Sequence, residues 1–115
     1  MSINGPEVLA ELRGPARELR HLIPEVMEGF AHSHQATFAP GALDTRTKEL
    51  MAFAISVGKQ CDGCIASHAR GAAKAGATVQ EAAEAIGVAI LMNGGPATVY
   101  GPRALAVFQE FAQPD

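Results

Sequence analysis

Apolar side chains recur at the spacing of an α-helix along most of this chain. A short helix over residues 7–12 is predicted first, and Gly14-Pro15 should end it. From Pro15 to about residue 36 the spacing predicts a longer amphipathic helix that Pro24 can bend or restart. Its apolar positions are Leu19, Leu22, Ile23, Val26, Met27 and Phe30.

A loop over residues 38–43 should follow, with Asp44 as the N-cap of a helix over residues 45–58. Residues 50–55 of that helix are apolar on every side, which predicts burial inside the domain or at a subunit contact.

Three further helices are predicted in the second half of the chain. One runs over residues 62–74 and stops at Gly76, and one starts at the capping box that Thr78 and Glu81 form. The last covers residues 97–112, with Val99 and Phe108 among the residues on its inner side. The sequence thus predicts an all-α fold of about six helices.

Composition adds an expectation about packing. The 115 residues form one domain and include 22 alanines, with 18% charged and 5% aromatic residues, which favours helices packed closely through small side chains. Such a core buries little area per residue. We therefore expect the chain to bury more helix surface in a homo-oligomer.

Charge and hydropathy exclude several classes of function. A net charge of -3 without a basic stripe argues against nucleic acid as a partner. No secretory signal or membrane-spanning run is present, so we expect a soluble, cytoplasmic protein that does not bind membranes. In that reducing compartment, paired cysteines are more often catalytic, redox-active or metal-binding than structural.

The candidate chemistry lies in the segment from Cys61 to His68. Cys61 should lie near a helix N-cap and Cys64 in the first turn, where the helix dipole favours thiolates. His68 follows Cys64 by four residues, on the same helical face, as a base beside a nucleophile. The exposed first cysteine of such a pair is often the more reactive one, and this observation favours Cys61; the spacing to His68 favours Cys64.

Other interpretations of these residues are open from the sequence. Zinc could bind Cys61, Cys64 and His68 if a fourth ligand came from Glu49, His32 or His34, although that set is unusual for a structural site. Glu49 is equally consistent with a solvated carboxylate near a helix start. We interpret His21, His32 and His34 as solvated, and Gly94-Gly95-Pro96 as a turn and not a phosphate loop.

With Glu49, Cys61-x-x-Cys64 and His68 in place, the sequence resembles the alkylhydroperoxidase (AhpD-like) group of the carboxymuconolactone decarboxylase superfamily, in its short single-domain form. The resemblance covers about residues 20–112. It implies an AhpD-like helical bundle, homo-oligomers that are often trimers or hexamers, thiol peroxidase or thiol-disulfide activity, and no bound cofactor or metal.

The resemblance also implies roles for the four residues. Cys64 is the thiol that attacks peroxide, Cys61 resolves it as a disulfide, His68 takes the Cys64 proton, and Glu49 orients His68. Gly63 departs from members that place a histidine between the cysteines, which puts proton delivery to Cys61 in doubt. Members that act as lactone decarboxylases generally lack the cysteine pair.

Together these observations predict a peroxidase that reduces hydroperoxides and is regenerated by an external dithiol. Longer, two-repeat relatives receive electrons from lipoyl-bearing enzymes, so a lipoyl-type reductant is one option. The alternatives are a thiol-disulfide reductase or isomerase, and a redox-sensing oligomer without turnover.

Overall fold

The computed structural model describes residues 4–112, and six α-helices make up most of that range. The predicted all-α fold is therefore confirmed. The helices are α1 (Gly5–Leu22), α2 (Pro24–Phe38), α3 (Thr45–Lys59), α4 (Asp62–Lys74), α5 (Val79–Asn93) and α6 (Gly95–Ala112). No helix in the described range is long and apolar enough to cross a membrane.

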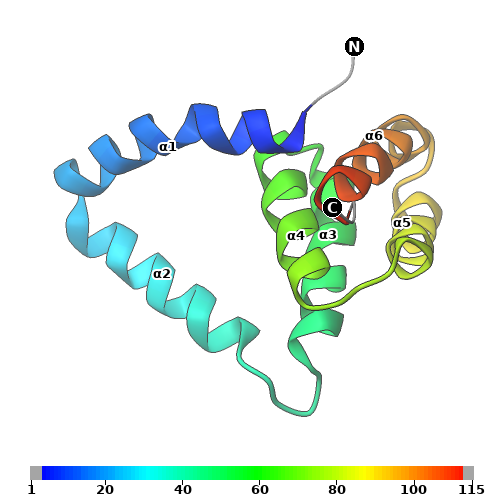
Figure 1. Ribbon diagram of the computed structural model, residues 1–115, viewed down its shortest axis with the longest axis horizontal. Helices are drawn as coiled ribbons and strands as arrows, with labels where there is room; N and C mark the ends of the chain where they lie inside the picture. The colour runs from blue at the N-terminus through cyan, green and yellow to red at the C-terminus, as the bar shows by residue number, and fades with distance from the viewer. Residues whose placement is uncertain (1–3, 113–115) are drawn as a thin grey trace.

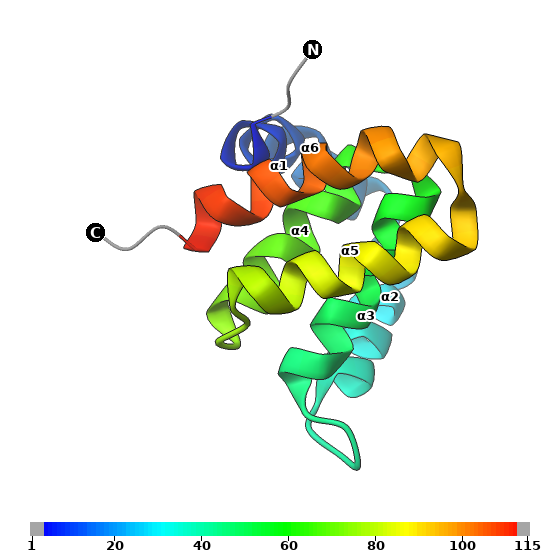
Figure 2. The ribbon, with the colours of Figure 1, turned by 90° about the vertical axis from the view of Figure 1, so that its right-hand side faces the viewer.

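Two helix pairs form the body of the molecule. α3 and α4 lie side by side and are joined by a tight connection at Gln60 and Cys61, while α5 and α6 are joined at Gly94 and cross that pair (Figure 2). The core lies between the two pairs, where the rings of Phe53 and Phe108 pack with centroids 6.0 Å apart. In this packing α4 is central, because it contacts α1, α3 and α6.

Small side chains allow the helices to approach closely, as the composition predicts. A Cβ atom on Gly101 of α6 would lie 2.9 Å from the Cγ2 atom of Ile86 in α5, so only glycine fits this crossing without a shift. The buried alanines of the core are Ala66, Ala69, Ala72, Ala77, Ala82, Ala89, Ala97 and Ala104.

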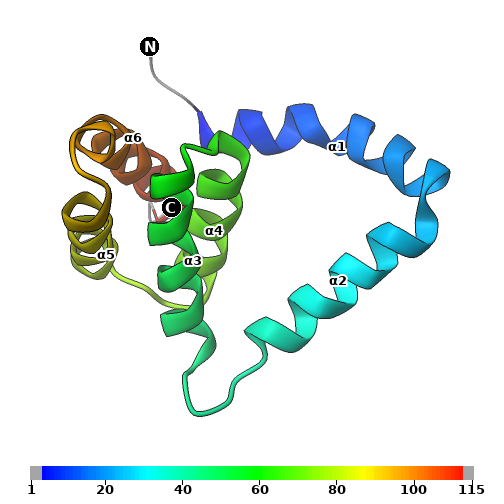
Figure 3. The ribbon, with the colours of Figure 1, turned by 180° about the vertical axis from the view of Figure 1, so that it is seen from behind.

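The first two helices form an arm that leaves the body and returns to it (Figures 1 and 3). α1 is attached at its start, where the Gly5 amide donates to Glu110 Oε1 at 2.9 Å, and where Leu12 approaches Gly63 of α4. Helix α2 buries none of its residues within the chain. The arm therefore presents most of its surface to solvent in a single chain.

The predicted break at Gly14-Pro15 is wrong, because α1 continues through it to Leu22. A proline disfavours helical geometry at the preceding residue through that residue's Cβ atom, which Gly14 lacks. The predicted restart at Pro24 is confirmed, because Ile23, with a φ of -134° and a ψ of 62°, leaves the helix immediately before Pro24. Ile23 carries the branched side chain that Gly14 does not.

Two further boundaries differ from the predictions: α2 includes Phe38, and α6 begins at Gly95, so Gly95 and Pro96 are helical and only Gly94 separates α5 from α6. The predicted caps of α3, α4 and α5 are confirmed. The Asp44 carboxylate accepts the Thr47 amide at 2.8 Å, Thr78 and Glu81 form a capping box, and Gly76 adopts a φ of 93° after α4. One predicted core position is wrong: Val99 is 62% exposed, because it lies on the outer side of α6.

Candidate redox site

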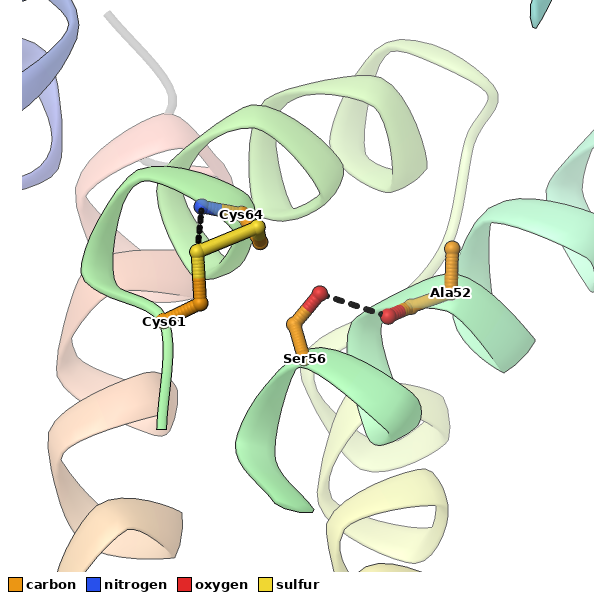
Figure 4. Close-up of a disulfide and its surroundings, with 4 residues drawn as sticks. All are labelled: Ala52, Ser56, Cys61 and Cys64. Atoms are coloured by element: carbon orange, nitrogen blue, oxygen red, sulfur yellow. Dashed lines mark hydrogen bonds between the residues drawn. A yellow bond between two sulfur atoms is a disulfide. The ribbon is translucent and has the colours of Figure 1, made fainter. Parts of the chain in front are cut away.

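A disulfide between Cys61 and Cys64 closes the first turn of α4 (Figure 4). Cys61 is the N-cap residue, in extended geometry, and its Sγ atom accepts the Cys64 amide at 3.2 Å. The two Cα atoms are 5.2 Å apart. Cys64 is exposed and Cys61 half-buried, so Cys64 is the more accessible of the two sulfurs to a molecule in solution.

The connection between α3 and α4 positions Cys61. Gln60 adopts the left-handed conformation with a φ of 55°, and the Cys61 amide then donates to the Ser56 carbonyl at 3.3 Å. Ser56 is only 4% exposed, and its hydroxyl, which lies on the side of α3 that faces the disulfide, donates to the Ala52 carbonyl at 2.7 Å (Figure 4). Ser56 could not be predicted as part of the site, because a serine within an apolar helix gives no distinctive sequence signal.

Glu49 and His68 form the second bonded pair of the site. The Nδ1 atom of His68 lies 2.7 Å from Glu49 Oε1. An ionised carboxylate can only accept, so Nδ1 carries the proton and Nε2 is left as the basic nitrogen. Glu49 is 8% exposed, so its interpretation as a solvated carboxylate is wrong.

Gly71 makes room for this pair one turn further along α4. A Cβ atom at this position would lie 2.5 Å from the Glu49 Cδ atom and 2.9 Å from its Oε1 atom. Such distances do not occur between real side chains, so the carboxylate occupies space that any other residue would fill. Gly71 was not among the residues predicted for the site.

The end of α2 packs against the imidazole of His68. The rings of His34 and His68 are stacked with centroids 6.1 Å apart, and the Phe38 ring lies 5.5 Å from His68. His34 is exposed, as predicted for a solvated histidine, but that interpretation missed its contact with His68. His21 and His32 are exposed, as predicted for solvated histidines.

Lys48 of α3 holds this end of α2 in place. Its ammonium donates to the carbonyls of Thr37 at 2.9 Å and of Ala39 at 2.7 Å. The Thr45 hydroxyl donates to the Phe38 carbonyl at 2.7 Å. These donors satisfy carbonyls that the end of a helix leaves unpaired, and they fix Phe38 beside His68.

The four residues predicted for the site thus form two bonded pairs along one face of α4. His68 follows Cys64 by one helical turn, so the imidazole and the exposed sulfur lie on the same face. Within residues 4–112, no hydrogen bond joins the imidazole to either sulfur. In the same range, no three His, Cys, Asp or Glu side chains are grouped to hold a metal ion.

The sequence of this chain matches one protein family over most of its length. The Carboxymuconolactone decarboxylase family matches residues 24–110, which is most of the chain. The chain belongs to this family. The predicted resemblance is therefore confirmed at the level of the superfamily.

The chain is also similar in sequence to two bacterial proteins. The chain is 43% identical over 83 residues to uncharacterized protein 4 in the cox locus of Paracoccus denitrificans, covering 72% of this chain and 75% of that one. It is 35% identical over 100 residues to an uncharacterized protein of Cupriavidus necator, covering 87% and 88% respectively.

Solved structures support the same family fold. Apo-lpg0406, a carboxymuconolactone decarboxylase family protein from Legionella pneumophila, is similar with a TM-score of 0.91 and 39% identity, over 95% of this chain and 97% of that one. A Thermotoga maritima protein, TM1620, is similar with a TM-score of 0.71 and 31% identity, over 82% and 88%.

Proposed function

We propose that this carboxymuconolactone decarboxylase family protein is a thiol-dependent peroxidase that reduces organic hydroperoxides. The observation that carries the proposal is the disulfide between Cys61 and Cys64 at the start of α4, one turn from the bonded pair of Glu49 and His68. A pair that can be oxidised and a base of fixed tautomer are the two parts that this reaction needs.

The oxidative half-reaction starts from the dithiol. Nε2 of His68 takes the Cys64 proton, and the thiolate attacks the terminal oxygen of the hydroperoxide. The O–O bond breaks, the sulfur loses two electrons and becomes a sulfenic acid, and the proton leaves with the alkoxide as an alcohol. The Cys61 thiol then attacks the Cys64 sulfur, releases water and closes the disulfide. The alkoxide takes its proton most directly from the imidazolium.

The reductive half-reaction is supported by the exposure of the two sulfurs. An external dithiol attacks the exposed Cys64 sulfur, and Cys61 leaves as a thiolate. The Cys64 amide, 3.2 Å from Cys61 Sγ, and the helix N-terminus stabilise that leaving group. A second attack by the dithiol releases Cys64 and leaves the reductant oxidised. The proposal sets this cycle in a reducing cytoplasm, where such thiols are available.

We also propose that the working form is a homo-oligomer. α2 buries no residue within the chain, and an isolated helix of this length is marginal in water. A second copy can cover it, because the body carries its own exposed apolar face on α3 and α5. On the arm the exposed apolar residues include Leu12, Leu19, Leu22, Ile23, Val26 and Phe30, and on α3 and α5 they include Met51, Ile55, Val79, Val88, Leu91 and Met92.

The activity is tested by following cumene hydroperoxide consumption with dithiothreitol as reductant. Replacing Cys64→Ser should abolish turnover, whereas Cys61→Ser should leave a sulfenic acid on Cys64 that dimedone traps after one equivalent of peroxide. The two single variants are matched controls for each other. Trapping on Cys61 in the Cys64→Ser variant, with none in the Cys61→Ser variant, would exchange the two roles.

A comparison of substrates separates the peroxidase from its alternatives. Faster reduction of a small model disulfide than of cumene hydroperoxide identifies a thiol-disulfide reductase or isomerase. A change in oligomeric mass on oxidation, with no turnover of either substrate, identifies a redox-sensing oligomer. Either outcome refutes the peroxidase proposal.

A further inference from the structure

An open pocket of about 400 Å³ lies directly beside the bonded pair of Glu49 and His68. His34 of α2 and Glu49 of α3 line one side of it. The other side comes from α4, which contributes Ser67, Arg70 and Lys74. None of the roles proposed above uses Arg70 or Lys74.

The pocket has an excess of positive charge. Arg70 and Lys74 lie one turn apart on the same side of α4, and within residues 4–112 neither is ion-paired with an acidic side chain. The acid of the pocket is Glu49, whose Oε1 atom is already bonded to His68. Both side chains are exposed to solvent, so a ligand that enters the pocket can contact them.

The distance from Cys64 to these cations limits how long a ligand must be to contact both. Arg70 and Lys74 follow Cys64 by six and ten residues in α4, which corresponds to about 9 and 15 Å along the helix axis. Ser67 and Gly71 line the pocket and lie on the face of α4 that Cys64 shares, whereas Lys74 is turned by about 80° and Arg70 by about 120° from Cys64 around the helix axis. A linear ligand that extends from Cys64 over Ser67 and Gly71 meets the cations through their long side chains, which line the same pocket.

We propose that Arg70 and Lys74 form a carboxylate subsite for the organic substrate, which is then a hydroperoxide of a linear carboxylic acid. The proposal rests on the proposed peroxidase function and names its substrate class. The guanidinium of Arg70 can bind a carboxylate through two parallel hydrogen bonds, and Lys74 adds a point charge. The carboxylate is unchanged in the reaction, since the two electrons from Cys64 break only the O–O bond.

The kinetic test compares linoleic acid hydroperoxide with its methyl ester under identical detergent conditions. The native chain should use the acid with a kcat/KM about tenfold or more above that of the ester, mainly through KM. The double variant Arg70→Gln/Lys74→Gln should lose this preference by raising KM for the acid alone. The control Arg17→Gln/Arg20→Gln removes the same charge from exposed residues of α1 and should keep it.

A binding test that needs no turnover separates this inference from the peroxidase proposal. Octanoate, added to the disulfide form of the full chain, should shift the NMR signal of the Arg70 side chain, and octanamide should not. If octanoate shifts it and no hydroperoxide is consumed, the carboxylate subsite stands and the peroxidase proposal fails. If the acid and ester react equally, or octanoate and octanamide act alike, the subsite is refuted.

Discussion

The carboxylate of Glu49 fills the space that a side chain on Gly71 would occupy. Glu49 comes from α3 and Gly71 from α4, and the two helices are close enough here that a Cβ atom would lie 2.5 Å from Glu49 Cδ. The absence of a side chain at Gly71 leaves room for the carboxylate to bond to His68, which lies three residues before Gly71 on the same helix.

Replacing Gly71→Ala should therefore displace Glu49 and break its bond to His68. We expect kcat/KM for hydroperoxide to fall by about tenfold or more, since the imidazole loses its fixed tautomer. Gly87→Ala is the matched control, because a Cβ atom there meets nothing within 4 Å. That control should stabilise the protein by about 0.5–1 kcal/mol in urea unfolding, because alanine favours a helix. Equal activity in the two variants would contradict the prediction.

Glu49→Gln tests the charge of the carboxylate with little change in shape. Glutamine cannot stabilise the imidazolium that forms when His68 takes the Cys64 proton, so kcat/KM should fall by about 100-fold. The rate of disulfide reduction should change much less, because the His68 base is not needed for attack on Cys64. Glu18→Gln on α1, an exposed carboxylate, is the control and should match the native chain in both assays.

The ring of His34 should act as a positioning group for His68. Its stacking at 6.1 Å restrains the imidazole plane, and an aromatic pair of this kind is worth about 0.5–1.5 kcal/mol, so His34→Ala should lower kcat/KM about 2- to 10-fold. His32→Ala, two residues earlier on the same helix, should have no effect. A purely structural role predicts instead that the two variants differ in melting temperature and not in the NMR signals of the His68 ring.

The folding stability of the protein should depend on pH in part through Asp44. The side-chain and backbone hydrogen bonds from Thr47, with help from Arg46, lower the pKa of Asp44 below its ordinary value of 3.8. A carboxyl whose pKa is lower in the folded state than in the unfolded state stabilises the fold when the pH is above its unfolded pKa. This stabilisation is lost as the pH falls through the folded pKa.

Asp44→Asn keeps the N-cap and removes the titration. The melting temperature of the variant should therefore approach that of the native chain as the pH is lowered from 7 to 3, and the difference should be largest at neutral pH. A difference that stays constant over this range would show that Asp44 contributes no pH dependence.

The exposed apolar surface of the arm predicts association. Phe30 is 69% exposed, and Phe30→Glu should place a charge at the contact and reduce the mass measured by analytical ultracentrifugation. Glu28→Gln on the same helix is the control and should leave the mass unchanged. A native chain that sediments as a monomer at micromolar concentration would refute the proposed homo-oligomer.

Most of the fold could be predicted because its signals are local. The helices from Thr45 onward begin and end at caps that residues within one turn provide, as the Thr78 capping box shows. The pairing of Cys61 with Cys64 could be predicted for the same reason, because the two cysteines are three residues apart. Where a local signal was ambiguous the prediction was wrong: interruptions were expected at both Gly14-Pro15 and Pro24, and only the one before Pro24 occurs.

The sequence by itself determined the helices, the cysteine pair and the placement of His68 on the face of Cys64, because each depends on spacing within one segment. The tertiary structure decided which residues surround His68. Glu49, Gly71, His34 and Phe38 meet there from three helices, and the burial of Glu49 follows from how closely α3 and α4 approach. Such distances depend on the packing of the whole core, which the spacing of residues along one helix does not specify.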